Sequence, residues 1–142
     1  MSRIRRIIHA TDFSRASRAA FAKAVDLAKA SRAELLVLHV LSVVPPFLGE
    51  GSLAPQMWND IEAGARAGAK RQLKRLVARA RRAGVCVKSL VLLGSPYEHI
   101  LRAAQRQRAD LLVIGTHGRP GLGKVLLSSV AERVPSLLRS NP

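Results

Sequence analysis

The stretch Asp110–Gly123, DLLVIGTHGRPGLG, decides how this chain of 142 residues is expected to fold. It opens with an apolar run, DLLVI, of the kind found in strands that are covered on both faces of a parallel sheet. The run leads directly into a segment with four glycines, at positions 115, 118, 121 and 123. Glycines let backbone N–H groups converge on an anion without obstruction by side chains. The stretch therefore predicts a buried strand followed by a phosphate-binding loop.

Outward from this stretch, apolar runs alternate with helical patterns along the whole chain. Three more strands are predicted over 4–9, 34–40 and 85–93. Helices are expected to begin after Ser14, near Gln56 and after Ser95, with a last helix starting near Ser128. With right-handed crossovers, this order predicts an α/β fold with a single domain over residues 1–142. Its core would be an open parallel sheet of Rossmann-like, three-layer α/β/α architecture.

The composition limits the cellular context that we expect. Apolar residues make up 48% of the chain, which is enough to bury a core. A lone cysteine, Cys86, cannot form an internal disulfide. The N-terminus lacks the long apolar segment of a signal peptide, and no apolar run reaches the roughly 18 residues of a membrane span. We therefore expect a cytoplasmic protein without a membrane partner.

The formal net charge of +15 favours anionic partners in general. Much of it lies on the helical pattern over 56–83, whose exposed side is rich in arginine and lysine. With one Trp, one Tyr and three Phe, the chain offers few aromatic rings on which bases could stack. We interpret the charge mainly as a solvated basic surface, and a nucleic-acid-binding protein stays as an alternative.

Ligands of open parallel sheets bind outside the carboxyl ends of the strands, so the residues that follow each strand are the candidates. Asp12 follows the first strand, where its carboxylate could bind a ribose hydroxyl or a metal held by phosphates, or could instead cap the first helix. The spacing leaves both roles open. His9, His39 and His117 also lie near strand ends. Without Cys or Glu at ligand spacing, His9 and His39 are interpreted as packed residues more than as metal ligands.

Gly118–Val125, GRPGLGKV, is nearly a P-loop of the form G-x-x-x-x-G-K-[ST]. The match to the P-loop pattern fails at Val125, which has no hydroxyl to offer Mg²⁺. The segment also follows the fourth predicted strand, which argues further against a true P-loop. No G-x-S-x-G elbow or pair of carboxylates suggests hydrolytic catalysis. A small ATPase is therefore a minor alternative.

Taken together, these segments resemble the universal stress protein family over residues 4–134. The resemblance rests on Ala10–Ser14 (ATDFS), on the run Leu35–Val40, and on Val113–Leu122 with Ser128–Val134. The nucleotide motif of that family is G-x2-G-x9-G followed by Ser or Thr. Gly115 and Gly118 match its first two positions, and Ser129 matches the last.

The resemblance implies the family's adenine-nucleotide hydrolase-like fold and a site for ATP or AMP, with Mg²⁺ as a further ligand. Asp12 would contact the ribose or the metal, and the backbone of Val40 would contact adenine. The implied binding residues are Thr11, Asp12, Val40, Gly115, His117, Gly118, Ser128, Ser129 and Val130. It also implies a regulatory role in stress tolerance, weak or absent ATP hydrolysis, and a homodimer.

The chain departs from the family pattern in two places. Ser128 replaces the third glycine of the motif, and its Cβ is expected to crowd a phosphate. The end of the chain, from Pro135 to Pro142, has prolines and a polar tail where the family has a fifth strand. We therefore predict four parallel strands and leave the homodimer open. The departures also keep open a degenerate stress protein that binds no nucleotide and acts through protein contacts.

Overall fold

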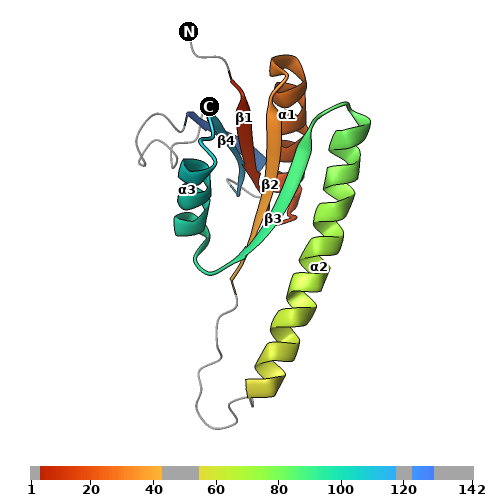
Figure 1. Ribbon diagram of the computed structural model, residues 1–142, viewed down its shortest axis with the longest axis vertical. Helices are drawn as coiled ribbons and strands as arrows, with labels where there is room; N and C mark the ends of the chain where they lie inside the picture. Colours follow the sequence, from red (N-terminus) through yellow and green to blue (C-terminus); the bar gives the residue numbers. More distant parts are fainter. Residues whose placement is uncertain (1–3, 43–54, 118–122, 130–142) are drawn as a thin grey trace.

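The computed structural model describes residues 4–42, 55–117 and 123–129 (Figure 1). In chain order, the elements are β1 (Arg6–Ala10), α1 (Arg15–Ser31), β2 (Glu34–Leu41), α2 (Pro55–Arg82), β3 (Val87–Leu93), α3 (Pro96–Arg106), β4 (Leu111–His117) and β5 (Gly123–Ser129). The α/β alternation predicted from the apolar runs is confirmed up to β4.

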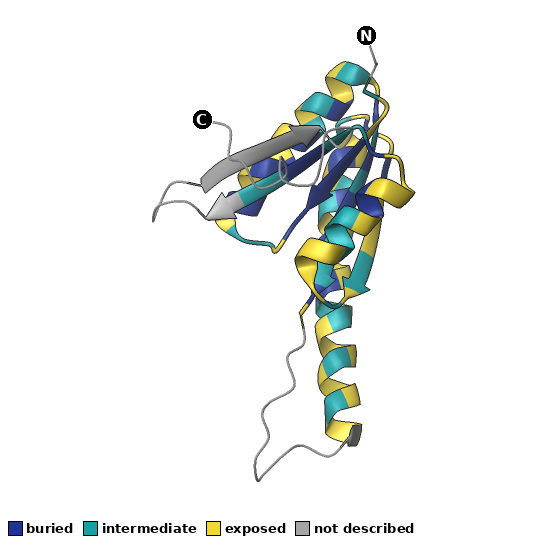
Figure 2. Cartoon of the chain, turned by 90° about the vertical axis from the view of Figure 1, so that its left-hand side faces the viewer, coloured by how far each residue is buried: buried dark blue, intermediate teal, exposed yellow. Residues whose placement is uncertain are grey.

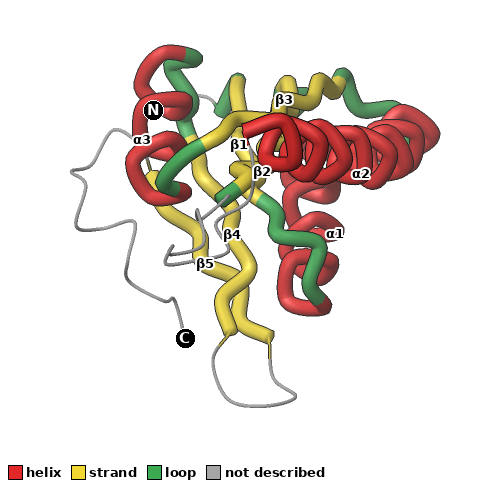
Figure 3. The backbone as a smooth tube through the Cα atoms, turned by 90° about the horizontal axis from the view of Figure 1, so that it is seen from below, coloured by secondary structure: helices red, strands yellow, loops and turns green. Residues whose placement is uncertain are grey.

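The strands form one sheet in the order β3-β2-β1-β4-β5. The pairs β1–β2, β1–β4 and β2–β3 are parallel, so the predicted open sheet of four parallel strands is confirmed. Helices α1 and α2 cover one face and α3 lies on the other, as the end-on view in Figure 3 shows. Because the chain steps from β1 outward to β3 and then returns to β4 on the far side of β1, the topological switch point lies between β1 and β4.

Two apolar clusters hold the layers together, one on each face of the sheet. Ile7 and Val37 belong to the cluster under α1 and α2, whereas Ile8 and Leu38 belong to the cluster that contains α3 residues. Successive residues of a strand point to opposite faces. The central strands are apolar at nearly every position because both of their faces are covered (Figure 2).

The helix ends mostly follow the residues that predicted them. The hydroxyl of Ser14 accepts the N–H of Ser17 at 3.2 Å, which confirms Ser14 as the N-cap of α1. Gly84 follows α2 with a φ of +87°, the left-handed conformation expected of a C-terminal glycine. Ser95 occupies the N-cap position of α3 before Pro96, but its side chain makes no capping hydrogen bond.

The segment after β4 corrects the prediction from sequence. The strand does not end at Ile114 but continues through Gly115 to His117, and Gly123–Ser129 returns as β5, antiparallel to β4. A helix starting near Ser128 is therefore wrong. The sequence KVLLSS, with its apolar centre, is able to pair with the edge of β4 that β1 leaves free, and that hydrogen-bonded edge decides its conformation.

Within the described residues, none of the three helices combines the length and apolar character needed to cross a membrane. The longest, α2, extends past the sheet at its N-terminal end (Figure 1). Its hydrophobic side chains there, Met57 and Ile61, are half exposed.

Candidate functional site

The turn that follows β1 is held in place by three hydrogen bonds to Thr11. The Thr11 N–H donates to the carbonyl of Leu38 at 2.8 Å, and its hydroxyl accepts the N–H of Phe13 at 3.0 Å. The Nδ1 of His39 lies 2.7 Å from the Thr11 carbonyl oxygen. A carbonyl oxygen only accepts, so Nδ1 of His39 carries the proton. The carboxyl end of β1 is thereby tied to β2.

Asp12 anchors the start of α1 from this turn. Its Oδ1 accepts the N–H of Ser14 at 3.0 Å and the hydroxyl of Ser17 at 2.6 Å, while its own N–H donates to the Ser17 oxygen at 3.1 Å. Asp12 therefore forms the turn and cap contacts that its position in the sequence allowed. Its side chain is nevertheless exposed at the carboxyl edge of the sheet, where a ligand can reach it.

Phe13 adopts a strained backbone conformation within the same turn. Its φ is +64°, a left-handed value that costs a non-glycine residue about 1–2 kcal/mol. Its ring packs on that of His39, with centroids 4.5 Å apart and planes tilted by 33°. Strain of this kind persists only where the surroundings enforce it, and it is concentrated at functional sites.

Among the described residues, the backbone groups of Val40 have no partner in this turn. In a strand, backbone groups alternate between the two neighbouring strands. Leu38 directs its carbonyl to the β1 side, where it accepts from Thr11, and Val40 faces the same side two residues later. The β1–β2 register ends at Ala10 opposite Leu38. Within the described residues, no hydrogen bond from the β1–α1 turn reaches Val40.

Gly115 is required where β4 passes beneath the first turn of α1. A Cβ at Gly115 would overlap the backbone carbonyl of Ala16 and would lie 2.7 Å from the backbone nitrogen of Ser17. The sequence suggested only phosphate binding for this glycine. The structure adds a packing role, which seats the N-terminus of α1 against the sheet.

Two of the other predicted phosphate contacts, Ser128 and Ser129, lie away from this turn. His117 ends β4 opposite Gly123, but Ser128 and Ser129 pair with Leu112 and Leu111 near the amino end of that strand. Five residues of strand separate Leu112 from His117, or about 17 Å. Two further predicted positions, Gly118 and Val130, lie outside the described residues.

His9 is a buried residue behind the turn. It is fully buried, and its Nδ1–H donates to the carbonyl of Val113 at 3.0 Å. Its Nε2 has no hydrogen-bond partner among the described residues. Burial lowers the pKa of His9 from 6.5 to about 4, against the opposing effects of the Val113 hydrogen bond and the Asp12 charge. His9 is therefore neutral at physiological pH.

The contacts of His9 and His39 are those of packed residues that tie neighbouring segments together. His9 and His39 each use Nδ1 on a backbone carbonyl. In the part of the chain that the structure describes, no three His, Cys, Asp or Glu side chains gather as metal ligands.

Comparison with known proteins assigns the family. The family model described as "Universal stress protein family" matches residues 3–136. The chain belongs to the universal stress protein family. A family member from Methanocaldococcus jannaschii is 36% identical over 133 residues, which cover 92% of this chain and 75% of that protein. A solved family structure from Burkholderia pseudomallei, 27% identical, superposes with a TM-score of 0.68 over 82% of this chain and 85% of its own.

Two similar family structures are complexes with adenine nucleotides. One, in complex with cAMP, is 22% identical, with a TM-score of 0.56 over 78% of this chain and 71% of its own. The other, from Archaeoglobus fulgidus in complex with dAMP, is 22% identical, with a TM-score of 0.55 over 80% of this chain and 82% of its own. At this level of sequence identity, the likeness to these two structures shows a shared fold.

Proposed function

We propose that this universal stress protein binds an adenine nucleotide, ATP or AMP, at the carboxyl edge of β1 and β2 and acts as a regulator. The observation that carries the proposal is that, in the described structure, the backbone of Val40 makes no hydrogen bond to the β1–α1 turn beside it. A peptide N–H and C=O side by side match the acceptor and donor on the edge of adenine. The site adjoins the switch point of the sheet, and relatives of the same fold bind cAMP and dAMP.

We propose that Asp12 contacts the ribose hydroxyls, and its exposed carboxylate at the same edge supports this role. Mg²⁺ is commonly held by one or two carboxylates together with phosphate oxygens, and Asp12 would be its protein ligand. The proposed regulator binds nucleotide without rapid turnover. Hydrolysis near about 10 per second, a median enzyme rate, would contradict it.

The test is calorimetric titration of AMP, and of ATP with and without Mg²⁺, into the wild type and two matched variants. Asp12→Asn keeps an oxygen that accepts from Ser14 and Ser17 but removes the charge. We expect nucleotide affinity to fall roughly tenfold while the melting temperature changes little. Asp26→Asn makes the same charge change on the exposed side of α1 and should bind as the wild type does. Equal affinities for all three proteins would refute the assignment of Asp12.

The placement of Ser128 and Ser129 supports a second candidate. Both lie near the amino end of β4, away from the turn, so they supply no phosphate contact in this arrangement. A family member that lacks these phosphate-binding residues at its nucleotide site would act through protein contacts instead. Failure of the wild type to bind AMP or ATP at millimolar concentration would favour this second function.

A further inference from the structure

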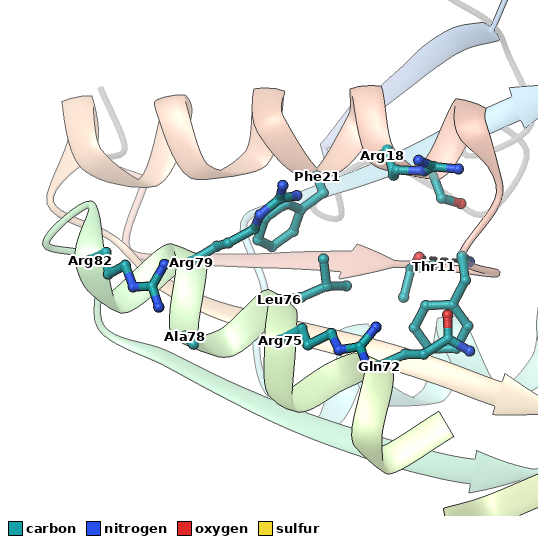
Figure 4. Close-up of a pocket in the computed structure, with 11 residues that line it drawn as sticks. Thr11, Arg18, Phe21, Gln72, Arg75, Leu76, Ala78, Arg79 and Arg82 are labelled. Atoms are coloured by element: carbon teal, nitrogen blue, oxygen red, sulfur yellow. Dashed lines mark hydrogen bonds between the residues drawn. The ribbon is translucent and has the colours of Figure 1, made fainter. Parts of the chain in front are cut away.

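A groove between α1 and α2 is lined by neither Asp12 nor Val40, the residues of the proposed nucleotide site. It has a volume of about 490 Å³ and extends from Thr11, at the end of β1, to Arg82, near the end of α2 (Figure 4). Pockets of this size hold small-molecule ligands. Of the predicted nucleotide-binding residues, only Thr11 lines it.

Four arginines define this arginine groove: Arg18 of α1 and Arg75, Arg79 and Arg82 of α2. Residues at spacings of four and three lie on one face of a helix, so the three α2 arginines form a row along the groove. The row spans seven residues of helix, or about 10 Å. Figure 4 shows Arg79 extending from α2 towards α1, beside Phe21, whereas Arg75 extends along α2 towards Gln72.

The described lining of the arginine groove carries positive charge and no negative charge. Among the residues that the structure describes, no acidic side chain lines the groove, and the ion pair between Lys88 and Glu34 lies elsewhere. From Ala63 to Arg82, α2 carries eight arginines and lysines and no acidic residue. Like charges so close together repel one another, and a bound anion would relieve that repulsion. Guanidinium groups bind phosphate through paired hydrogen bonds.

The base of the groove is apolar and gives the site depth. Phe21, which is 5% exposed, and the half-buried Leu76 lie between the arginines of the two helices. Apolar walls lower the local dielectric, which strengthens charge interactions at the rim. A second basic hollow on α2, lined by Arg66, Lys70 and Lys74, lies against β3 and not against α1.

We propose that the arginine groove is a second binding site, for a small molecule that carries two or more phosphate groups. The 10 Å row suits phosphates at successive positions better than a single anion. A single-stranded nucleic acid needs exposed rings for its bases to stack on, and Phe21 is nearly covered. The groove therefore favours a small polyphosphate ligand over a nucleic acid. This proposal does not depend on nucleotide binding at the carboxyl edge.

Inorganic tripolyphosphate is the probe for a calorimetric test on the full chain at about 150 mM salt, where diffuse attraction between exposed charges is screened. The wild type should bind it saturably with one-to-one stoichiometry. The groove variant Arg75→Gln/Arg79→Gln should lose roughly tenfold or more in affinity. The control Arg71→Gln/Arg81→Gln removes the same charge from exposed positions on α2 that do not line the groove. It should bind within about twofold of the wild type.

Several results would overturn the proposal. Equal weakening in the two double variants would show diffuse attraction and no site, and so would non-saturable binding by the wild type. Tighter groove-dependent binding of a single-stranded oligonucleotide would assign the groove to nucleic acid. A titration in saturating AMP separates the two proposals. Displacement of tripolyphosphate by AMP would reduce them to one site, whereas a wild type that binds tripolyphosphate but no AMP would refute only the nucleotide site.

Discussion

The β1–α1 turn (Thr11–Ser14) and the arginine groove meet at the start of α1, yet they are built in opposite ways. The turn uses backbone groups and short side chains that hydrogen-bond to one another, with Phe13 held at a φ of +64°. The groove uses long cationic side chains from two helices, and no acidic residue of the described structure lines it.

This difference shows where each kind of site can be recognised. A turn of neighbouring residues leaves a compact signature in the sequence, such as ATDFS at Ala10–Ser14. A groove assembled from Arg18 and a row some sixty residues later leaves only an excess of charge. The turn is rigid because its own residues satisfy one another, whereas the groove keeps its charges available to a ligand.

The largest effect is expected from Gly115, because both regions depend on the seating of α1. Gly115→Ala places a Cβ against the backbone carbonyl of Ala16, which cannot move without shifting the helix. We expect a loss of roughly 1–3 kcal/mol or more in the free energy of unfolding, together with weaker ligand binding at both sites. Urea denaturation measures the first and calorimetry the second.

Gly64→Ala is the control for this substitution. A Cβ at Gly64, inside α2, would have no neighbouring atom within 4 Å. Alanine should therefore stabilise the helix by about 0.5–1 kcal/mol. If both alanine variants were equally stable, the close approach of β4 to α1 would not be what requires Gly115.

His9 lies behind both regions and links their stability to pH. Its ring is 5.8 Å from that of Phe21 in the groove, and its pKa is lowered to about 4. The unfolded chain takes up a proton near pH 6.5 but the folded protein does not. The contribution of the neutral His9 to the free energy of unfolding is thus fully present above pH 6.5. It falls by about 1.4 kcal/mol per pH unit as the pH drops towards 4.

This pH dependence can be followed by denaturation at several pH values and by NMR titration of the four histidines. The His9 resonance should show no protonation down to about pH 5, while the folded state persists. A His9 that titrates near 6.5 would contradict the buried, neutral imidazole.

Substitutions at Asp12 test the turn separately from the groove, and their expected effect on stability is smaller. Asp12→Ala removes the oxygen that accepts from Ser14 and Ser17, and it should lower the free energy of unfolding by about 1 kcal/mol. Asp12→Asn should cost less because it keeps an acceptor. Thermal melts compare the two. Neither change should alter tripolyphosphate affinity, and a loss there would mean that the two regions act as one site.

Ser128→Gly should have the smallest effect on binding. In the family pattern this position is a glycine, and the sequence suggested that restoring it would tighten ATP binding by removing a Cβ. The structure instead pairs Ser128 with Leu112, far from the turn. Calorimetry should therefore find ATP affinity unchanged, with a stability loss of about 0.5–1 kcal/mol from glycine in a strand. Tighter binding would place Ser128 at the phosphates and contradict this arrangement.

The apolar periodicity of the sequence was sufficient to predict the four parallel strands, their helices and the position of the turn. Those features depend on local pattern: continuous apolar runs for strands covered on both faces, Ser14 for the N-cap of α1 and Gly84 for the end of α2. The family resemblance, carried by short motifs along the chain, was likewise available before any coordinates.

Only the tertiary structure decided the rest, because it depends on contacts between residues distant in the chain. The close approach of Ala16 explains Gly115, and the β1–β2 pairing ends before it reaches Val40. Gly123–Ser129, where the sequence predicted the end of a loop and the start of a helix, forms a strand because it pairs with the edge of β4. The packing of α2 beside α1 gathered four arginines into one groove. Sequence spacing determines what lies on one element, whereas the juxtaposition of two elements follows from the packing of the whole core.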